Sequence, residues 1–138
     1  GQERFRSMAP MYYRGAKMAI IVFDVTKEDS FAKIDSWHKD LVAYAEPDVA
    51  ISVAANKADQ PHPHFNEAEA RARCTRIGIH NFVLTSAFTG QGVDELFMQT
   101  GRDAVLKNPK LIPATTNDRE YSKSVVTLDS RKRKRSCC

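Results

Sequence analysis

The sequence predicts an α/β protein in which parallel strands alternate with helices. Three short apolar segments, residues 17–25, 49–55 and 80–86, have the length of strands, and each precedes a segment of helical character. The first, KMAIIVFDV, contains a continuous apolar run and not an alternating one, which is typical of a strand buried on both faces. Strand–helix repeats of this kind form parallel sheets with right-handed crossovers.

The first helix is predicted to follow the first strand closely. Asp29 or Ser30 can serve as its N-cap, because short polar side chains accept hydrogen bonds from the first helical N–H groups. Pro47 then marks its end. One face of this helix is apolar, since large side chains recur at three- and four-residue spacing at Phe31, Ile34, Trp37, Leu41 and Tyr44.

The second helix is predicted between the second and third strands, after the loop DQPHPH. Asn66 and Glu69 have the spacing of a capping pair, which marks the start of a helix. From there the helix should run to about Ile77, where Gly78 ends it.

A third helix and a flexible tail are predicted for the rest of the chain. Gly90 and Gly92 indicate a turn after the third strand, and a helix should then cover Val93–Lys107. The following segment has two prolines, many Ser and Thr residues and no sustained period, which is typical of a flexible linker. We therefore expect a domain over residues 1–108, a linker over 109–130 and a tail over 131–138.

The composition fits a single globular domain whose charge is unevenly distributed. The 138 residues are 42% hydrophobic and 28% charged, and the net charge is +4. The segment RKRKR, residues 131–135, holds five of the 21 basic residues, so residues 1–130 have 16 basic and 17 acidic side chains and a net charge of −1. A nearly neutral body argues against a nucleic-acid partner.

The cysteine pattern argues against a disulfide framework or a zinc site. Cys74, Cys137 and Cys138 form no CxxC pair and their number is odd, so a reducing compartment and no metal site are expected. Cys74 falls in the middle of a predicted helix and should be an ordinary buried thiol. No apolar run reaches about 18 residues, the length that would span a bilayer.

Two polar corners fall at the carboxyl ends of predicted strands, where parallel sheets bind ligands. NKAD, residues 56–59, follows the second strand, and SAF, residues 86–88, follows the third. Because these ends share one edge of the sheet, the two corners can converge on one ligand. The alternative for NKAD is an ordinary polar turn.

Several segments resemble one known family. NKAD matches the NKxD motif of Ras-like guanine-nucleotide-binding proteins, and TSA, residues 85–87, resembles their second guanine loop. GQERF, YYRGA and FDVT resemble Rab-family segments, and APMYYRGA with the ending KRSCC is most similar to the early-endosomal Rab branch. The resemblance covers residues 1–107 in register. It implies the carboxyl-terminal part of a P-loop GTPase (Ras-like) fold, with the amino-terminal third absent.

The resemblance implies that the two corners read guanine. Asp59 would accept from the ring N1–H and the exocyclic amine, a donor pair that adenine does not present. Asn56 would contact the N7 and O6 side of the base and brace the loops, and the stem of Lys57 would lie over the ring. In the second loop, Ser86 precedes Ala87, whose backbone N–H would donate to O6.

Phe88 is a departure from the family, in which Lys is usual after Ser-Ala. The stem of that lysine covers one side of the base. A phenyl ring can stack there as well, so the apolar contact is retained, while any polar contact of the ammonium group is lost.

The first residues of the chain match the family's catalytic and effector-binding segments. Gln2 resembles the glutamine that orients the attacking water in GTP hydrolysis, and Gly1 resembles the glycine whose N–H meets the γ-phosphate. RFRSMAPMYYRG is rich in large apolar residues, which mark partner surfaces, and Phe5 and Tyr12 are the expected effector contacts. For Phe5 and Tyr13 the alternative is packing under the sheet.

The tail matches a lipid-anchored membrane segment. Five consecutive basic residues alone could indicate nuclear targeting, a nucleic-acid patch or contact with an anionic membrane. The terminal Cys137 and Cys138 favour the membrane, because they match the doubly geranylgeranylated end of Rab proteins and two lipids give a stable anchor.

Two classes of function follow from these patterns. The first is a membrane-anchored GTP/GDP switch of vesicle traffic on the cytoplasmic face of early endosomes, cycling with the cytosol and using Mg²⁺ in the complete protein. Its partners would be exchange factors, activating proteins, effectors and a dissociation inhibitor. The second is a nucleotide-independent Rab-like scaffold. The 138 residues contain no GxxxxGK[ST] motif and no first switch, so we expect this chain alone to bind GTP poorly and not to hydrolyse it.

Overall fold

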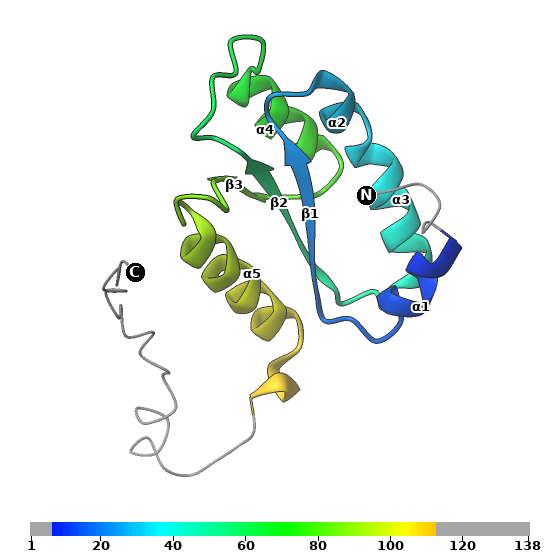
Figure 1. The fold of residues 1–138 in the computed structure, drawn as a ribbon. Helices are drawn as coiled ribbons and strands as arrows, with labels where there is room; N and C mark the ends of the chain where they lie inside the picture. Colours follow the sequence, from blue (N-terminus) through cyan, green and yellow to red (C-terminus); the bar gives the residue numbers. More distant parts are fainter. Residues whose placement is uncertain (1–6, 113–138) are drawn as a thin grey trace, which may run out of the picture.

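The computed structural model of the protein describes residues 7–112, which form a three-stranded parallel sheet (Figure 1). The strands are β1 (Met18–Asp24), β2 (Ala50–Asn56) and β3 (Asn81–Thr85), in the order β1-β2-β3. Each bound lies within one residue of the strand that the sequence predicts. The parallel α/β architecture is therefore confirmed.

The register brings the carboxyl ends of the three strands into one row. Asp24 of β1 lies opposite Asn56 of β2, and Asn56 lies opposite Thr85 of β3. The loops that leave these three residues therefore begin side by side. This row is where the two polar corners of the sequence were expected to converge.

The first predicted helix is two helices. α2 (Glu28–Ala32) and α3 (Ile34–Tyr44) are separated at Lys33, and the N-cap of α2 is Lys27 and not Asp29 or Ser30. The hydroxyl of Ser30 instead accepts a hydrogen bond from the backbone N–H of Asp24 at 2.9 Å, so it ties α2 to the end of β1.

The apolar face of this segment is shorter than the spacing predicts. Ile34 and Leu41 are buried and Phe31 and Trp37 pack against the core, whereas Tyr44 at the end of α3 is exposed. The prediction that Tyr44 belongs to the buried face is therefore wrong.

The two later helices agree closely with their sequence signals. α4 (Glu67–Arg76) begins after Asn66, whose side chain accepts from the backbone N–H of Glu69 at 3.1 Å, as the capping pattern predicts. Gly78 follows α4 with φ +86°. α5 (Val93–Lys107) has the predicted bounds and is followed by a short 3-10 helix, η2 (Pro109–Leu111). Neither η2 nor the short helix α1 (Ala9–Tyr13), which has Pro10 in its first turn, was predicted.

Helices cover both faces of the sheet (Figure 1). α3 and α4 pack on one face over a large core that includes Phe23 of β1 and the buried thiol of Cys74. The ring of Phe23 is 5.2 to 6.1 Å, centroid to centroid, from the rings of Phe31, Phe65 and Phe82. α5 packs on the other face over a smaller core around Leu96.

Burial raises the pKa of the Cys74 thiol to about 11, so this cysteine is an unreactive core residue, as predicted.

Within residues 7–112 every helix is too short or too polar to cross a bilayer.

Candidate functional site

Asn56 joins the two loops that the sequence singled out. It is the last residue of β2, and its Oδ1 accepts from the backbone N–H of Ala87 at 3.1 Å and from the hydroxyl of Thr85 at 3.3 Å. The backbone N–H of Ala58 donates to the carbonyl oxygen of Thr85 at 3.0 Å. The predicted bracing role of Asn56 is therefore present in the geometry.

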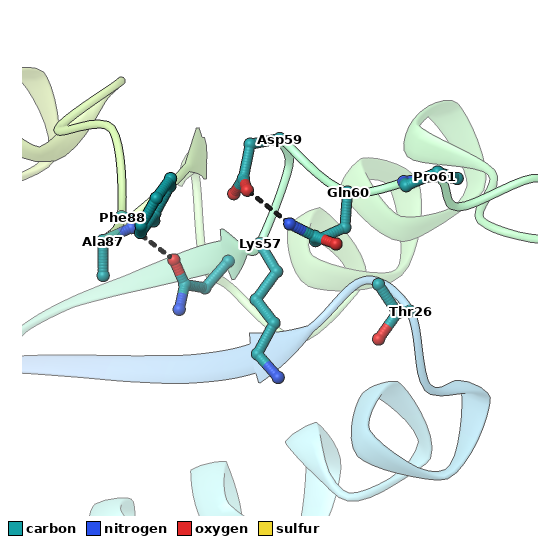
Figure 2. Close-up of a pocket in the computed structure, with 8 residues that line it drawn as sticks. Thr26, Lys57, Asp59, Gln60, Pro61, Ala87 and Phe88 are labelled. Carbon is teal, nitrogen blue, oxygen red and sulfur yellow. Dashed lines mark hydrogen bonds between the residues drawn. The ribbon is translucent and has the colours of Figure 1, made fainter.

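Lys57 has a left-handed backbone, with φ +67°, and this is the only non-glycine residue of the described chain with a positive φ. Its Nζ lies 2.7 Å from Oδ2 of Asp24 at the end of β1. Figure 2 shows the side chain running from its loop toward β1. The turn thus lays the apolar stem of Lys57 across the strand ends, with its charge neutralised by Asp24.

Asp24 is the anchor of this corner. Its Oδ1 accepts from the backbone N–H and the hydroxyl of Thr26 at 3.0 and 2.6 Å. Burial raises the pKa of Asp24, but the hydrogen bonds from Lys57 and Thr26 and the charge of Lys57 outweigh it and lower the pKa to about 2. Asp24 is therefore ionised at neutral pH and holds Lys57 in place.

Asp59 presents an ionised carboxylate to the same space. Hydrogen bonds from the side chains of Ser86 and Gln60 lower its pKa below the usual range. The contact with Gln60 joins Nε2 to Oδ2 over 2.7 Å. Ser86 itself is fully buried, and its hydroxyl oxygen accepts from the backbone N–H of Thr89 at 3.1 Å within the second loop. Its hydrogen bond to Asp59 therefore links the second loop to the first.

The loop after β3 is held in one shape by its backbone. The backbone N–H of Ser86 donates to the carbonyl oxygen of Gln91 at 2.9 Å, and the backbone N–H of Gly90 donates to the carbonyl oxygen of Ser86 at 2.8 Å. Gly92, at φ +69°, caps α5, and a Cβ on this residue would collide with the backbone oxygen of Leu84. Only glycine fits there, because the loop must pass directly over β3.

The two loops enclose an open pocket of about 610 Å³ at the carboxyl ends of the strands (Figure 2). Its lining consists of Thr26, Asn56, Lys57, Asp59, Gln60, Pro61, Ala87 and Phe88. The ring of Phe88 is 90% exposed at the edge of this pocket. An exposed ring, an alkyl stem, an amide and a carboxylate together suit a flat heterocycle that donates hydrogen bonds along one edge.

The backbone N–H of Ala87 has a different partner from the one that the family resemblance implies. The backbone N–H of Ala87, which the family resemblance assigns to a guanine oxygen, donates to Asn56 in this structure. A ligand at this position would share or replace that bond.

The sequence patterns did not indicate roles for four residues at this site: Thr26, Gln60 and Pro61, which line the pocket, and Asp24, which holds Lys57. The position of Asp24 at a strand end was an available signal, whereas the contact of Gln60 with Asp59 depends on the turn geometry.

The described residues contain no cluster of the usual metal-binding side chains. In residues 7–112 there is no group of three or more His, Cys, Asp or Glu side chains placed to hold an ion. His62 is instead engaged with the backbone oxygen of Gln60 over 2.6 Å.

Part of the expected effector surface lies within the described residues. Met8, Met11 and Tyr12 around α1 are all exposed, Tyr12 at 75%. Tyr13 is half-buried and lines a hollow of about 370 Å³ with Asp40 and Tyr44 of α3. The exposure fits a partner surface for Tyr12, while Tyr13 packs against the body, which was the alternative for that residue.

Five predicted site residues lie outside the described residues: Gly1, Gln2, Phe5, Cys137 and Cys138. The basic run of residues 131–135 and the linker after residue 112 also lie outside them.

Comparison with known proteins identifies the family. The model of the Ras family matches residues 1–106, most of the chain, and the chain therefore belongs to the Ras family. Among curated proteins, the chain is 39% identical over 102 residues to the ras-related protein Rab-5B of Dictyostelium discoideum, which supports a Rab-type member. The match covers 74% of this chain and 48% of that protein, so the chain spans about half the length of its relative.

Proposed function

We propose that the pocket at the carboxyl ends of β2 and β3 binds the guanine base of GTP and GDP, and that the chain is part of a Rab-type switch of vesicle traffic. Family membership supports guanine-nucleotide binding in general. The observation that carries the assignment to this pocket is the convergence of Asn56, Lys57, Asp59 and Phe88 around one space of suitable size.

The chemistry of each residue fits this ligand. The carboxylate of Asp59 accepts the N1–H and the exocyclic amine of guanine, and hydrogen bonds of this charged type contribute about 1.5–3 kcal/mol each. The base lies between the stem of Lys57 and the ring of Phe88. Asn56 holds the second loop against the first, so that Ser86 and Ala87 border the O6 side.

The remaining functional assignments follow the family resemblance. Gln2 orients the attacking water and Gly1 borders the γ-phosphate, in a complete protein that supplies the phosphate and Mg²⁺ sites. Phe5 and Tyr12 contact effectors. Cys137 and Cys138 carry geranylgeranyl groups, and the basic run before them rests on the cytoplasmic face of an anionic membrane. The similarity to the early-endosomal branch supports the early endosome as that membrane.

The test of the base pocket is a change of base preference in the longest product of the gene. Asp59→Asn replaces an acceptor with a donor, which then faces the exocyclic amine of guanine and weakens GDP binding. Xanthosine diphosphate, with a carbonyl at that position, should bind the variant better than GDP does. Asp48→Asn, at the opposite end of the sheet, is the matched control. Equal loss of both nucleotides in Asp59→Asn would refute the assignment.

The test of the anchor is the release of the protein from membranes. Cys137→Ser with Cys138→Ser removes both lipid sites and should move the protein to the soluble fraction. Neutralising residues 131–135 should weaken sedimentation with membranes less and reduce its sensitivity to salt. Full sedimentation of the double-Ser variant would exclude lipid anchoring at these cysteines.

A nucleotide-independent scaffold is the second candidate, because the exposed surface of Met11 and Tyr12 suits partner binding with or without nucleotide. Residues 1–138 alone should show weak binding of a fluorescent GTP analogue and no turnover. Submicromolar affinity with turnover in this chain would overturn that expectation. Absence of GDP binding in the longest gene product would favour the scaffold.

A further inference from the structure

The side chain of Gln60 is hydrogen-bonded to the carboxylate of Asp59, which the proposed ligand needs. Its side-chain Nε2 donates to Oδ2 of Asp59 over 2.7 Å, and both residues line the same pocket. In Figure 2 the Gln60 side chain turns back from its loop toward Asp59. The pocket therefore contains an amide N–H₂ group at one of the two oxygens that a guanine edge would use.

The backbone explains why Gln60 turns this way. The left-handed residue Lys57 starts a tight turn that the N–H of Gln60 closes by donating to the carbonyl oxygen of Lys57 at 2.9 Å. The carbonyl oxygen of Gln60 is engaged by Nδ1 of His62 at 2.6 Å. With both backbone groups fixed and Pro61 following, the side chain starts from a defined position beside Asp59.

The donor chemistry of Gln60 matches that of the base. A primary amide and the exocyclic amine of guanine each present an N–H₂ group. We propose that Gln60 is an internal substitute for the guanine amine, which satisfies Asp59 when the pocket is empty and must leave when the base enters. This proposal rests on the proposed function of the pocket, and it makes Gln60 a residue that sets base affinity and nucleotide release.

The consequence is a specific pattern of affinities. Binding of GDP costs the Gln60–Asp59 hydrogen bond, whereas inosine diphosphate lacks the exocyclic amine and leaves that bond in place. Gln60→Leu, which keeps the bulk and removes the donor, should therefore tighten GDP binding and slow its release by about 3- to 10-fold, the range of one hydrogen bond. Binding of inosine diphosphate should not change.

The experiment measures both nucleotides by competition in the longest product of the gene. The matched control is Gln99→Leu, because Gln99 makes the same amide–carboxylate contact with Glu95, Nε2 to Oε1 at 2.9 Å, on α5 and away from the pocket. The control should leave both affinities unchanged. Equal tightening of GDP and inosine diphosphate in Gln60→Leu would show a steric effect and overturn the proposal. Weaker GDP binding would overturn it too, because Gln60 would then support the bound state.

A second measurement separates this proposal from the proposed function. Without nucleotide, removal of the Gln60 donor should raise the pKa of Asp59 part of the way toward its usual value, because the hydrogen bond from Ser86, the larger cause of the lowered pKa, remains. NMR titration of the carboxyl group detects this rise. An unchanged pKa would overturn the proposal whatever nucleotide the protein binds. A raised pKa together with no GDP binding by any variant would instead refute the proposed function, and with it the role of Gln60 as a ligand substitute.

Discussion

The two edges of the sheet at which the strands begin and end carry similar polar residues, but these residues have different roles. At the amino ends of the strands, Asp48 is bound by Lys17 at 3.1 Å and by Asn108 at 2.7 Å, and Lys107 donates to the carbonyl oxygen of Val49 at 3.1 Å. These groups pair with one another and close that end. At the carboxyl ends, Asn56, Lys57 and Asp59 are braced by other residues around an open pocket.

The difference shows that polar residues can form a binding site when they face an open pocket and are not all paired with one another. Asp48 joins the residue before β1 to the residue after α5, so its function is to tie elements together. Asp59 keeps its carboxylate at the surface of a cavity, beside an exposed aromatic ring. Substitutions at the two ends should therefore separate stability from ligand binding.

The largest effect is expected at Gly92, which shapes the pocket loop. Gly92→Ala forces a side chain into a left-handed position and against the backbone oxygen of Leu84, which should lower the free energy of unfolding by about 2–4 kcal/mol. Gly90→Ala is the control, because its φ is +86° but no atom lies within 4 Å of the added Cβ. It should cost about 1–2 kcal/mol. Equal losses in urea denaturation would contradict the steric account.

A smaller effect is expected at Asn56. Asn56→Ala removes the hydrogen bonds to Ala87 and Thr85 and should cost about 1–2 kcal/mol of unfolding free energy. It should also weaken GDP binding by about 10-fold, because the second loop loses its brace. Asp48→Ala at the other end should cost up to about 1 kcal/mol and leave the GDP affinity unchanged. A loss of GDP affinity in Asp48→Ala would remove the distinction between the two ends.

At Phe88 the effect should be confined to the ligand. Because its ring is 90% exposed, Phe88→Ala should leave thermal stability unchanged. GDP affinity should fall by about 5-fold, since stacking on a base contributes about 1–3 kcal/mol and part of this contact is open to water. Phe97→Ala on α5 is the matched exposed control and should not affect binding. If both variants bind GDP as the parent does, Phe88 is not a base platform.

The smallest effect is expected from acid. The pKa of Asp24 is lowered to about 2 in the folded protein from an ordinary value of 3.8, so the contribution of its contacts with Lys57 and Thr26 is present above pH 3.8. It should be lost as the pH falls from 3.8 to about 2, by less than about 1 kcal/mol because the Lys57 partner is half exposed. Asp24→Asn should flatten this part of the stability profile. An unchanged profile would show that Asp24 does not stabilise the corner.

The sequence by itself determined the elements and the type of site. Continuous apolar runs and three- and four-residue spacing are local signals, so the strands and α5 were predicted within a residue of their bounds. The NKAD and TSA segments, with GQERF, YYRGA and FDVT, indicated the family, because they match its motifs in the same order. Cys74 was predicted to be buried from its position on a helix.

Only the tertiary structure decided how the site is held. The hydroxyl of Ser30 bonds to the backbone of Asp24 instead of capping a helix, and the position of the Lys57 amine depends on Asp24, which lies 33 residues earlier in the chain. The contact of Gln60 with Asp59 requires the left-handed turn at Lys57, and the need for glycine at residue 92 arises from Leu84 on β3. Apolar periodicity reports which face of an element is buried. It does not report which polar groups meet, because the sheet register and loop shape place them.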